Sequence, residues 1–182
     1  VDVMAALDEP LSLYDVEFVL VAGATDSVDW AAMQARAEEL WNLHRPTYFK
    51  AEARLPYDDE DLSDYAAYLE EEKQGVAARF VQVCAQYGKI TDSTGATNLR
   101  NAAGLQAGRV ISIPVQRATG RVRDGNVSQL KLPDGWMAAQ SVMEDAGYLT
   151  AKKYAGLDGV YWGDSRTLAD ATSDFQYEEV VR

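Results

Sequence analysis

The chain has 182 residues, of which 47% are hydrophobic and 25% charged, and its formal net charge is -12. This length and composition are typical of a globular domain and exclude collagen-like, low-complexity and disordered chains. The acidic balance disfavours nucleic acid and anionic membranes, which are themselves negative, so we expect neither as a partner. No apolar run approaches the ~20 residues that span a bilayer.

The chemistry open to the chain is limited by its single cysteine, Cys84, and its single histidine, His44. One thiol cannot form an internal disulfide, and a zinc cage needs more nitrogen or sulfur ligands than these two residues supply. The Gly-x-Ser-x-Gly motif of serine hydrolases is absent. We predict that Cys84 is a buried, inert thiol and that His44 lies at a core edge or a helix end. We expect no enzymatic activity, no metal and no cofactor.

The first half of the chain predicts a small parallel α/β layer. Apolar segments at 16–22, 47–53 and 80–85 have the character of strands, with centres about 30 residues apart, as in βαβ units. We expect the first strand to be buried on both faces, because its apolar run is nearly continuous, and the second to have one wetter face. Apolar residues at helical spacing predict helices between the strands, over 25–46, with Trp41 on the buried face, and over 62–75.

The second half has a different pattern. The Ala- and Gly-rich segment 98–110 predicts a helix, and 111–115 can be a strand. Asp124-Gly125 between two valines predicts a hairpin. A further helix is predicted over 136–146, stopped by a glycine, and 157–163 predicts a turn followed by a short strand.

The last stretch opens like a helix, because Ser173 can cap it and Gln176 completes a capping box. A helix that starts so close to the end of the chain predicts that the sequence is a fragment of a longer protein. We find no linker and no internal repeat, so we expect residues 1–182 to form a single domain.

Charge is segregated along the sequence. Segment 52–72 holds nine acidic residues against one arginine, whereas segment 100–131 holds six basic residues against one aspartate. Two solvated faces would explain this pattern; the alternative is a molecule with one acidic and one basic side, which favours head-to-tail contact between copies. Four tryptophans and ten tyrosines exceed the needs of such a core, so we expect some rings at interfaces. The predicted interface residues are Asp58, Asp59, Glu60 and Asp61 on one side and Arg117, Arg121 and Arg123, in a basic hairpin, on the other.

Two segments could bind a ligand. Gly23–Ser27 lies between a strand and a helix, where parallel α/β folds bind phosphate, but it lacks a P-loop lysine and Asp26 would repel an anion. The carboxylates of 58–61 could hold Ca²⁺ but lack the spacing of a calcium loop. We favour an ordinary turn and a solvated loop. A small α/β enzyme, or a nucleotide- or phosphate-binding domain that uses the Gly23–Ser27 turn, is the alternative function.

The most distinctive block of the sequence lies near its end, where a Gly/aromatic segment leads into Arg-Thr-Leu and then into a helix that ends in Arg182. Its motif residues are Tyr161, Trp162, Arg166, Thr167 and Leu168, followed by Asp174. This block resembles the contractile tail-sheath superfamily, including an uncharacterised bacterial and prophage family grouped with it. Upstream, the strand at 15–18, the helix at 98–109 and Pro114 with Gly120 are similar in order to the elements of the sheath core.

The resemblance implies a sheath-core-like α/β domain without its N- and C-terminal arms. It implies a structural subunit of a contractile phage tail or phage-like injection machine, which assembles into stacked rings or helical tubes. The implied partners are copies of the chain and an inner tail tube protein, either in a virion tail sheath or, if prophage-encoded, in the bacterial cytoplasm. Arg166 and Asp174 are expected to brace the closing strand against the following helix. We expect the fragment alone to be monomeric or weakly associated.

Overall fold

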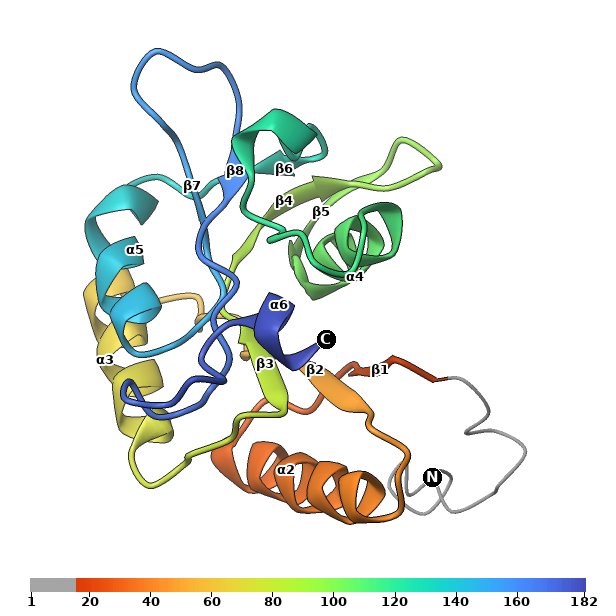
Figure 1. The fold of residues 1–182 in the computed structure, drawn as a ribbon. Coiled ribbons are helices and arrows are strands. Elements are labelled where there is room, and N and C mark those ends of the chain that lie inside the picture. Colours follow the sequence, from red (N-terminus) through yellow and green to blue (C-terminus); the bar gives the residue numbers. More distant parts are fainter. Residues whose placement is uncertain (1–15) are drawn as a thin grey trace.

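A three-stranded parallel sheet lies at the centre of the computed structural model, which describes residues 16–182 (Figure 1). The strands, in spatial order, are β1 (Phe18–Val21), β2 (Tyr48–Glu52) and β3 (Val81–Cys84). The connecting helices are α2 (Ser27–Asn42) and α3 (Leu62–Lys73). Phe18 pairs with Tyr48 and Phe49 with Val81, in parallel register. The predicted parallel layer is therefore confirmed.

The burial of the first two strands is the reverse of that predicted. β1 forms one edge of the three-stranded sheet and Leu20 is 36% exposed, so the prediction of a strand buried on both faces was wrong. β2 lies between its two neighbours, and even Lys50 in its middle is only 2% exposed, so the predicted wetter face was also wrong. A strand's place in the sheet decides its burial, and a central strand covered on both faces can bury a charge if that charge has a partner.

α2 begins as predicted and covers one face of the sheet (Figure 1). Asp26 caps the helix, and its Oδ1 accepts a hydrogen bond from the Asp29 amide at 2.9 Å. The prediction that Trp41 lies on the buried face was wrong. Its side chain is 48% exposed and stacks on Phe80 with a centroid distance of 5.5 Å. This ring packs at the rim of the core rather than inside it.

The end of α2 is a Schellman turn built around His44. The Arg45 amide donates to Leu40 O at 2.9 Å and the His44 amide to Trp41 O at 3.0 Å. His44 has φ +59°, and it is exposed. Glycine is favoured at this position of the turn, because a Cβ is strained in the left-handed region. His44 therefore lies at a helix end, as predicted.

A second, antiparallel sheet contains a β-hairpin, but not at the position predicted from the sequence. Its strands, in spatial order, are β5 (Thr97–Asn101), β4 (Tyr87–Thr91) and β6 (Leu130–Lys131). The β4–β5 turn is closed by Asp92, whose Oδ1 accepts amide hydrogen bonds from Thr94 at 2.9 Å and Ala96 at 3.1 Å. The hairpin predicted at Asp124-Gly125 was wrong: Val122–Asp124 is a single 3-10 turn, η1, because Arg109 and Arg117 hold the Asp124 oxygens.

The Ala- and Gly-rich helix starts later than predicted, since α4 spans Ala103–Ser112. The side chain of Asn101 sets this start: its Oδ1 accepts from the Ala103 amide at 2.8 Å, and its Nδ2 donates to Cys84 O at 2.8 Å. The residues before it belong to β5, so the helix predicted from 98 was wrong over its first turn, and Leu99 is exposed. The strand predicted at 111–115 was also wrong, because α4 continues through Ile111.

The last third of the chain adds a helix, a two-stranded sheet and a short closing helix. α5 (Trp136–Asp145) and β8 (Tyr161–Trp162), which pairs with β7 (Ala151–Lys152), confirm the predicted helix and strand. The closing helix, α6, spans Glu178–Val181 and does not start at Ser173 as predicted. The Ser173 hydroxyl oxygen instead accepts from the Phe175 amide at 3.1 Å in a turn.

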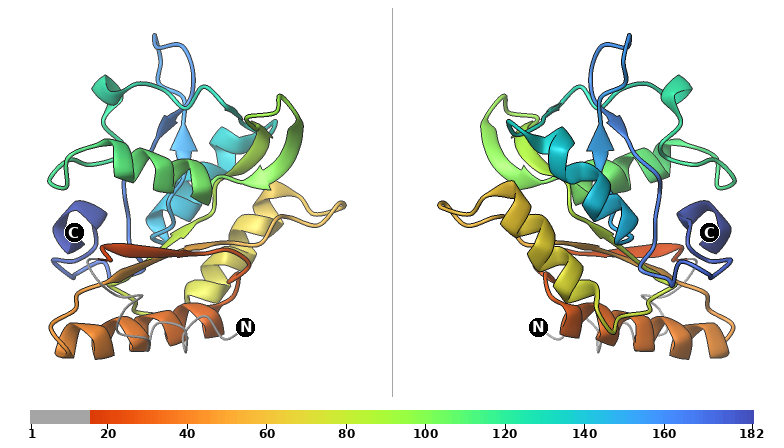
Figure 2. Two further views of the ribbon diagram at one scale, coloured as in Figure 1. Left: turned by 90° about the vertical axis from the view of Figure 1, so that its right-hand side faces the viewer. Right: turned by 90° about the vertical axis from the view of Figure 1, so that its left-hand side faces the viewer.

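The layers of the domain follow from these contacts. α2 lies on one face of the parallel sheet and α4 on the other, while α3 and α5 pack side by side at one end (Figures 1 and 2). Trp30, Trp136 and Trp162 are buried, so most of the aromatic surplus serves the interior, and Trp41 and Tyr57 are the exposed aromatic rings of the described part. No helix within residues 16–182 is long and apolar enough to cross a bilayer.

Candidate functional site

The strand-to-helix turn Gly23–Ser27 has its first and last backbone amides already occupied. The Gly23 amide donates to Glu52 Oε1 at 2.7 Å, and the Ser27 amide donates to Glu72 Oε2 at 2.8 Å. A phosphate would need these same amides, and it would meet carboxylates where it should bind. The geometry therefore favours the ordinary turn over a phosphate site.

The only buried ion pair of the described residues lies across the central sheet and was not predicted. Lys50 on β2 and Glu178 on α6 are 2.6 Å apart, and their side chains are 2% and 1% exposed. Lys50 Nζ also donates to Gln82 Oε1 at 2.5 Å and to Gln106 Oε1 at 2.7 Å. An ammonium has three protons, so every donor of Lys50 is used.

The carboxylate of Glu178 is equally saturated. Its Oε1 accepts from the Tyr48 hydroxyl at 2.7 Å as well as from Lys50, and its Oε2 accepts from Gln106 Nε2 at 2.8 Å and Gln82 Nε2 at 3.2 Å. Burial alone would raise the pKa of Glu178, but the charge of Lys50 and these donors lower it. Burial also lowers the pKa of Lys50, more than Glu178 raises it.

A buried lysine with a perturbed pKa is a candidate catalytic group in many proteins. Here Lys50 has neither a free donor nor an opening to solvent, because its partners from β3, α4 and α6 enclose it. A closed network of this kind orders the interior rather than acting on a substrate. We call this set of four side chains with Tyr48 the ionic network; its members are Tyr48, Lys50, Gln82, Gln106 and Glu178.

The distinctive sequence block leads into the network. Leu168 is buried and pairs with the outer side of β3, because its amide donates to Val81 O and its carbonyl accepts from Ala78 N, both at 2.9 Å. Thr167 Oγ1 donates to Phe175 O at 2.8 Å. Tyr161 and Trp162 are buried in β8. These motif residues are therefore structural.

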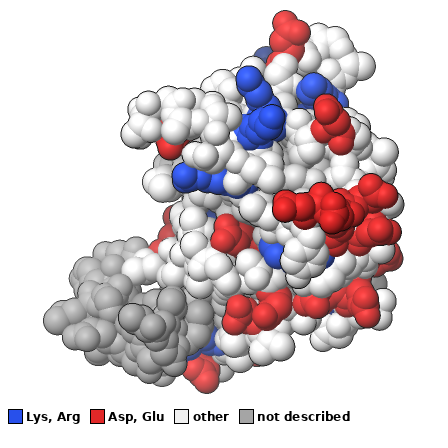
Figure 3. All heavy atoms as spheres, turned by 180° about the vertical axis from the view of Figure 1, so that it is seen from behind, with Lys and Arg blue, Asp and Glu red and all other residues white. Residues whose placement is uncertain are grey.

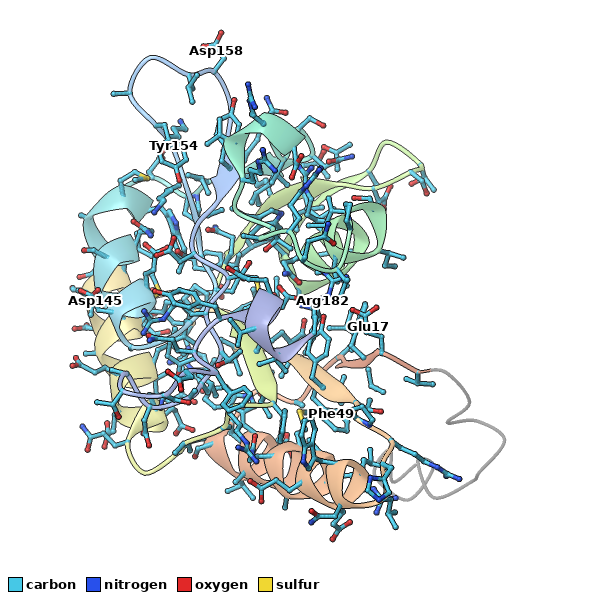
Figure 4. All side chains as sticks on the ribbon, viewed as in Figure 1. Glu17, Phe49, Asp145, Tyr154, Asp158 and Arg182 are labelled. Atoms are coloured by element: carbon cyan, nitrogen blue, oxygen red, sulfur yellow. The ribbon has the colours of Figure 1, made fainter. Side chains whose placement is uncertain are left out.

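Of the two residues predicted to hold the closing strand against the last helix, Arg166 does so and Asp174 does not. Arg166 forms a β-bridge with Tyr177, the N-cap of α6, and its guanidinium lies 5.4 Å from the centre of that ring. Asp174 is exposed and has no hydrogen bond or ion pair within residues 16–182. The end of α6 is held instead by Arg182, whose Nε donates to Glu17 Oε1 at 2.6 Å (Figure 4).

The acidic loop is divided between an internal and an external role. Glu60 binds Arg54 through two contacts of 2.6 Å, and Arg54 also lies over the rings of Tyr57 and Tyr68. Arg54 holds the pKa of Glu60 below its usual value, so this residue is engaged within the domain. Asp58, Asp59 and Asp61 are exposed. Acidic side chains gather on the side that carries α3 and α5 (Figure 3).

The basic segment is divided in the same way. Arg109 donates to the carbonyls of Asp124 and Gly125, and Arg117 pairs with the Asp124 carboxylate at 3.1 Å. Arg121 and Arg123 are exposed and make no ion pair or hydrogen bond with other described side chains. The structure thus leaves two of the three predicted interface arginines free.

The remaining candidates carry no reactive site. Cys84 is buried as predicted, and burial raises its pKa to about 12, which leaves the thiol unreactive at neutral pH. Among residues 16–182, no three His, Cys, Asp or Glu side chains converge as metal ligands would.

A groove runs between α3 and α5 with a volume of about 630 Å³. Small side chains form its floor, among them Ala66, Ala138 and Ala139, and acidic side chains stand on its rim. A second hollow, of about 470 Å³, shares Glu70 and Val142 with it. The predicted acidic interface therefore adjoins a concave surface of mixed character.

Together, the parallel sheet, the β4–β5 hairpin and the enclosed ionic network define a small α/β domain in which the buried charges of Lys50 and Glu178 are paired with each other. The chain belongs to the DUF2586 family, because the model of that family's N-terminal domain ("DUF2586, N-terminal domain") matches residues 1–166. No curated protein matches the chain. The family match ends at Arg166, whereas Glu178, which completes the ionic network, lies beyond it.

Proposed function

We propose that the chain is a non-catalytic structural subunit that assembles with copies of itself, of the kind found in the sheath of contractile phage tails and phage-like injection machines. In this role the copies form stacked rings or helical tubes around an inner tail tube protein. The assembly would belong to a virion tail sheath or, for a prophage, to the bacterial cytoplasm.

The observation that carries the proposal is the position of the unpaired charges. Acidic side chains gather around α3 and α5 (Figure 3), and Arg121 and Arg123, whose side chains have no partner among residues 16–182, follow the loop after α4. The loops at 55–61 and 113–121 project from opposite sides of the domain (Figure 2). Complementary surfaces on opposite sides favour a heterologous contact, which repeats from copy to copy and produces rings or tubes.

Two further features support assembly rather than catalysis. β5 is an edge strand of its sheet, and its residues from Thr97 to Arg100 are exposed, so its backbone can pair with a strand of another chain. The side chains with the most perturbed acid–base chemistry, Lys50 and Glu178, are saturated by one another and by two glutamines.

Electron microscopy of the complete gene product tests the proposal. We expect striated tubes or stacked rings, and we expect Arg121→Glu with Arg123→Glu to abolish them while circular dichroism and the melting temperature stay unchanged. Arg45→Glu, at an exposed arginine just after α2, is the matched control. Dispersed monomers across a range of protein and salt concentrations would contradict the proposal, because oppositely charged contacts should strengthen at low salt.

A further inference from the structure

We propose that the groove between α3 and α5 receives exposed side chains from the segment 111–123 of a second copy of this chain. The inference rests on the proposed function, since it names the partner and the contact through which the subunits join. The predicted contact between two charged loops thereby becomes a contact in which apolar side chains enter the groove and charged side chains pair beside it.

The acceptor side combines an apolar floor with an unpaired acidic rim. The floor holds Ala138 and Ala139 from α5 and Ala66 from α3. Asp61 and Asp134 stand on the rim and are exposed, and their carboxylates have no hydrogen bond or ion pair within the part of the chain that the structure describes. Such a groove favours an apolar side chain at its base with a cation beside it.

The donor side presents that combination. Ile111 is 75% exposed and Val115 is 47% exposed, although large aliphatic side chains are usually buried. Arg121 and Arg123 follow them and are unpaired among residues 16–182. One segment therefore offers two aliphatic anchors and two free cations, which matches the floor and the rim of the groove.

The partner is a second copy because the donor and the acceptor cannot meet within one chain. The loop after α4 projects from the side opposite the loop that leads into the groove (Figure 2). Their contact is heterologous, so each copy uses its donor on one neighbour and its acceptor on another. A groove of about 630 Å³ holds only a few side chains, whereas a standard stable interface engages about 20–30 residues on each side. A single contact is therefore weak, and repetition along a tube strengthens it.

Disulfide trapping in the complete protein tests this contact independently of tube formation. One variant carries Val115→Cys and a second carries Ala138→Cys; both positions are exposed, and the native Cys84 is buried with a raised pKa. After oxidation of the mixture, we expect at least about tenfold more covalent dimer than from Val115→Cys with Ala32→Cys, a matched exposed alanine on α2. Equal yields, or no dimer, would overturn the inference.

The same substitutions in one chain report the geometry. A chain with both Val115→Cys and Ala138→Cys should form a ladder of covalent multimers, because a heterologous contact leaves a free donor at one end of the multimer and a free acceptor at the other. A product that stops at a dimer would overturn the head-to-tail contact. Tubes without trapping would refute the groove and leave the proposed function intact, whereas trapping without tubes would support the groove and refute the sheath.

Discussion

Removing the charge of Glu178 is expected to be the most damaging conservative change in the domain. Glu178→Gln keeps the volume of the side chain but leaves the Lys50 ammonium buried without its counterion, 2% exposed in the central strand. Breaking a buried ion pair by removing one partner costs about 3–5 kcal/mol. For a domain of this size, each kcal/mol lowers the melting temperature by roughly 2–4 °C, so we expect a loss of about 10 °C.

The reciprocal variant and the double variant show whether the charges are coupled. Lys50→Met should cost a similar amount, because it leaves Glu178 unpaired among Tyr48, Gln82 and Gln106. The double variant has no unpaired charge, so its loss should fall short of the sum of the two single losses by about 2 kcal/mol.

Urea denaturation of the four proteins of this cycle measures these free energies of unfolding. Glu39→Gln is the matched control, because its pair with Arg36 is also 2.6 Å long but the Glu39 side chain is 63% exposed, and exposed carboxylates contribute about 0–1 kcal/mol through such pairs. Losses that add within about 0.5 kcal/mol would refute the coupling. A Glu178→Gln variant as stable as the control would refute the whole account of the ionic network.

Three further predictions follow from the structure. The pKa of Glu178 is below its usual 4.5 in the folded state. The contribution of its carboxylate to folding stability is therefore present above pH 4.5 and is lost as the pH falls through the folded-state pKa. Acid titration should show a smaller loss of stability below about pH 4.5 for the Lys50→Met/Glu178→Gln variant than for the parent protein. His44→Gly should raise stability by about 1 kcal/mol, because φ +59° favours glycine, and an unchanged urea midpoint would contradict this. Gly120→Ala should destabilise the domain by about 1–3 kcal/mol, because its Cβ would lie 2.1 Å from Gly163 O; a melting temperature equal to that of the exposed Gly108→Ala, which meets nothing within 4 Å, would contradict it.

The regular elements of the first half could be predicted because local pattern decides them. The spacing of three apolar segments predicted the β1-β2-β3 layer, and apolar periodicity predicted α2 and α3. Burial could not be predicted in the same way, because it depends on which strand becomes central. The one lysine in the Tyr48-Phe49-Lys50-Ala51 run was the available signal of a buried charge.

The wrong predictions for the second half of the chain have a common cause: side chains distant in sequence fix the local structure there. Asn101 sets the start of α4 by binding Cys84 O, and Arg109 and Arg117 turn Asp124-Gly125 away from a hairpin. Glu178 meets Lys50 across more than a hundred residues of sequence, so nothing local indicated the ionic network. The predicted interface charges were visible in the sequence, but only the fold separates the free Arg121 from the paired Arg117.

The attachment of α6 has a mechanical consequence. Tension applied at Arg182 passes through one short helix to Glu178 and from there to the middle strand of the sheet. To peel this end of the chain away, a pulling force must draw a carboxylate out of a dry interior and also strip Leu168 from the side of β3. A pull on this segment is therefore resisted by the core rather than by a surface turn.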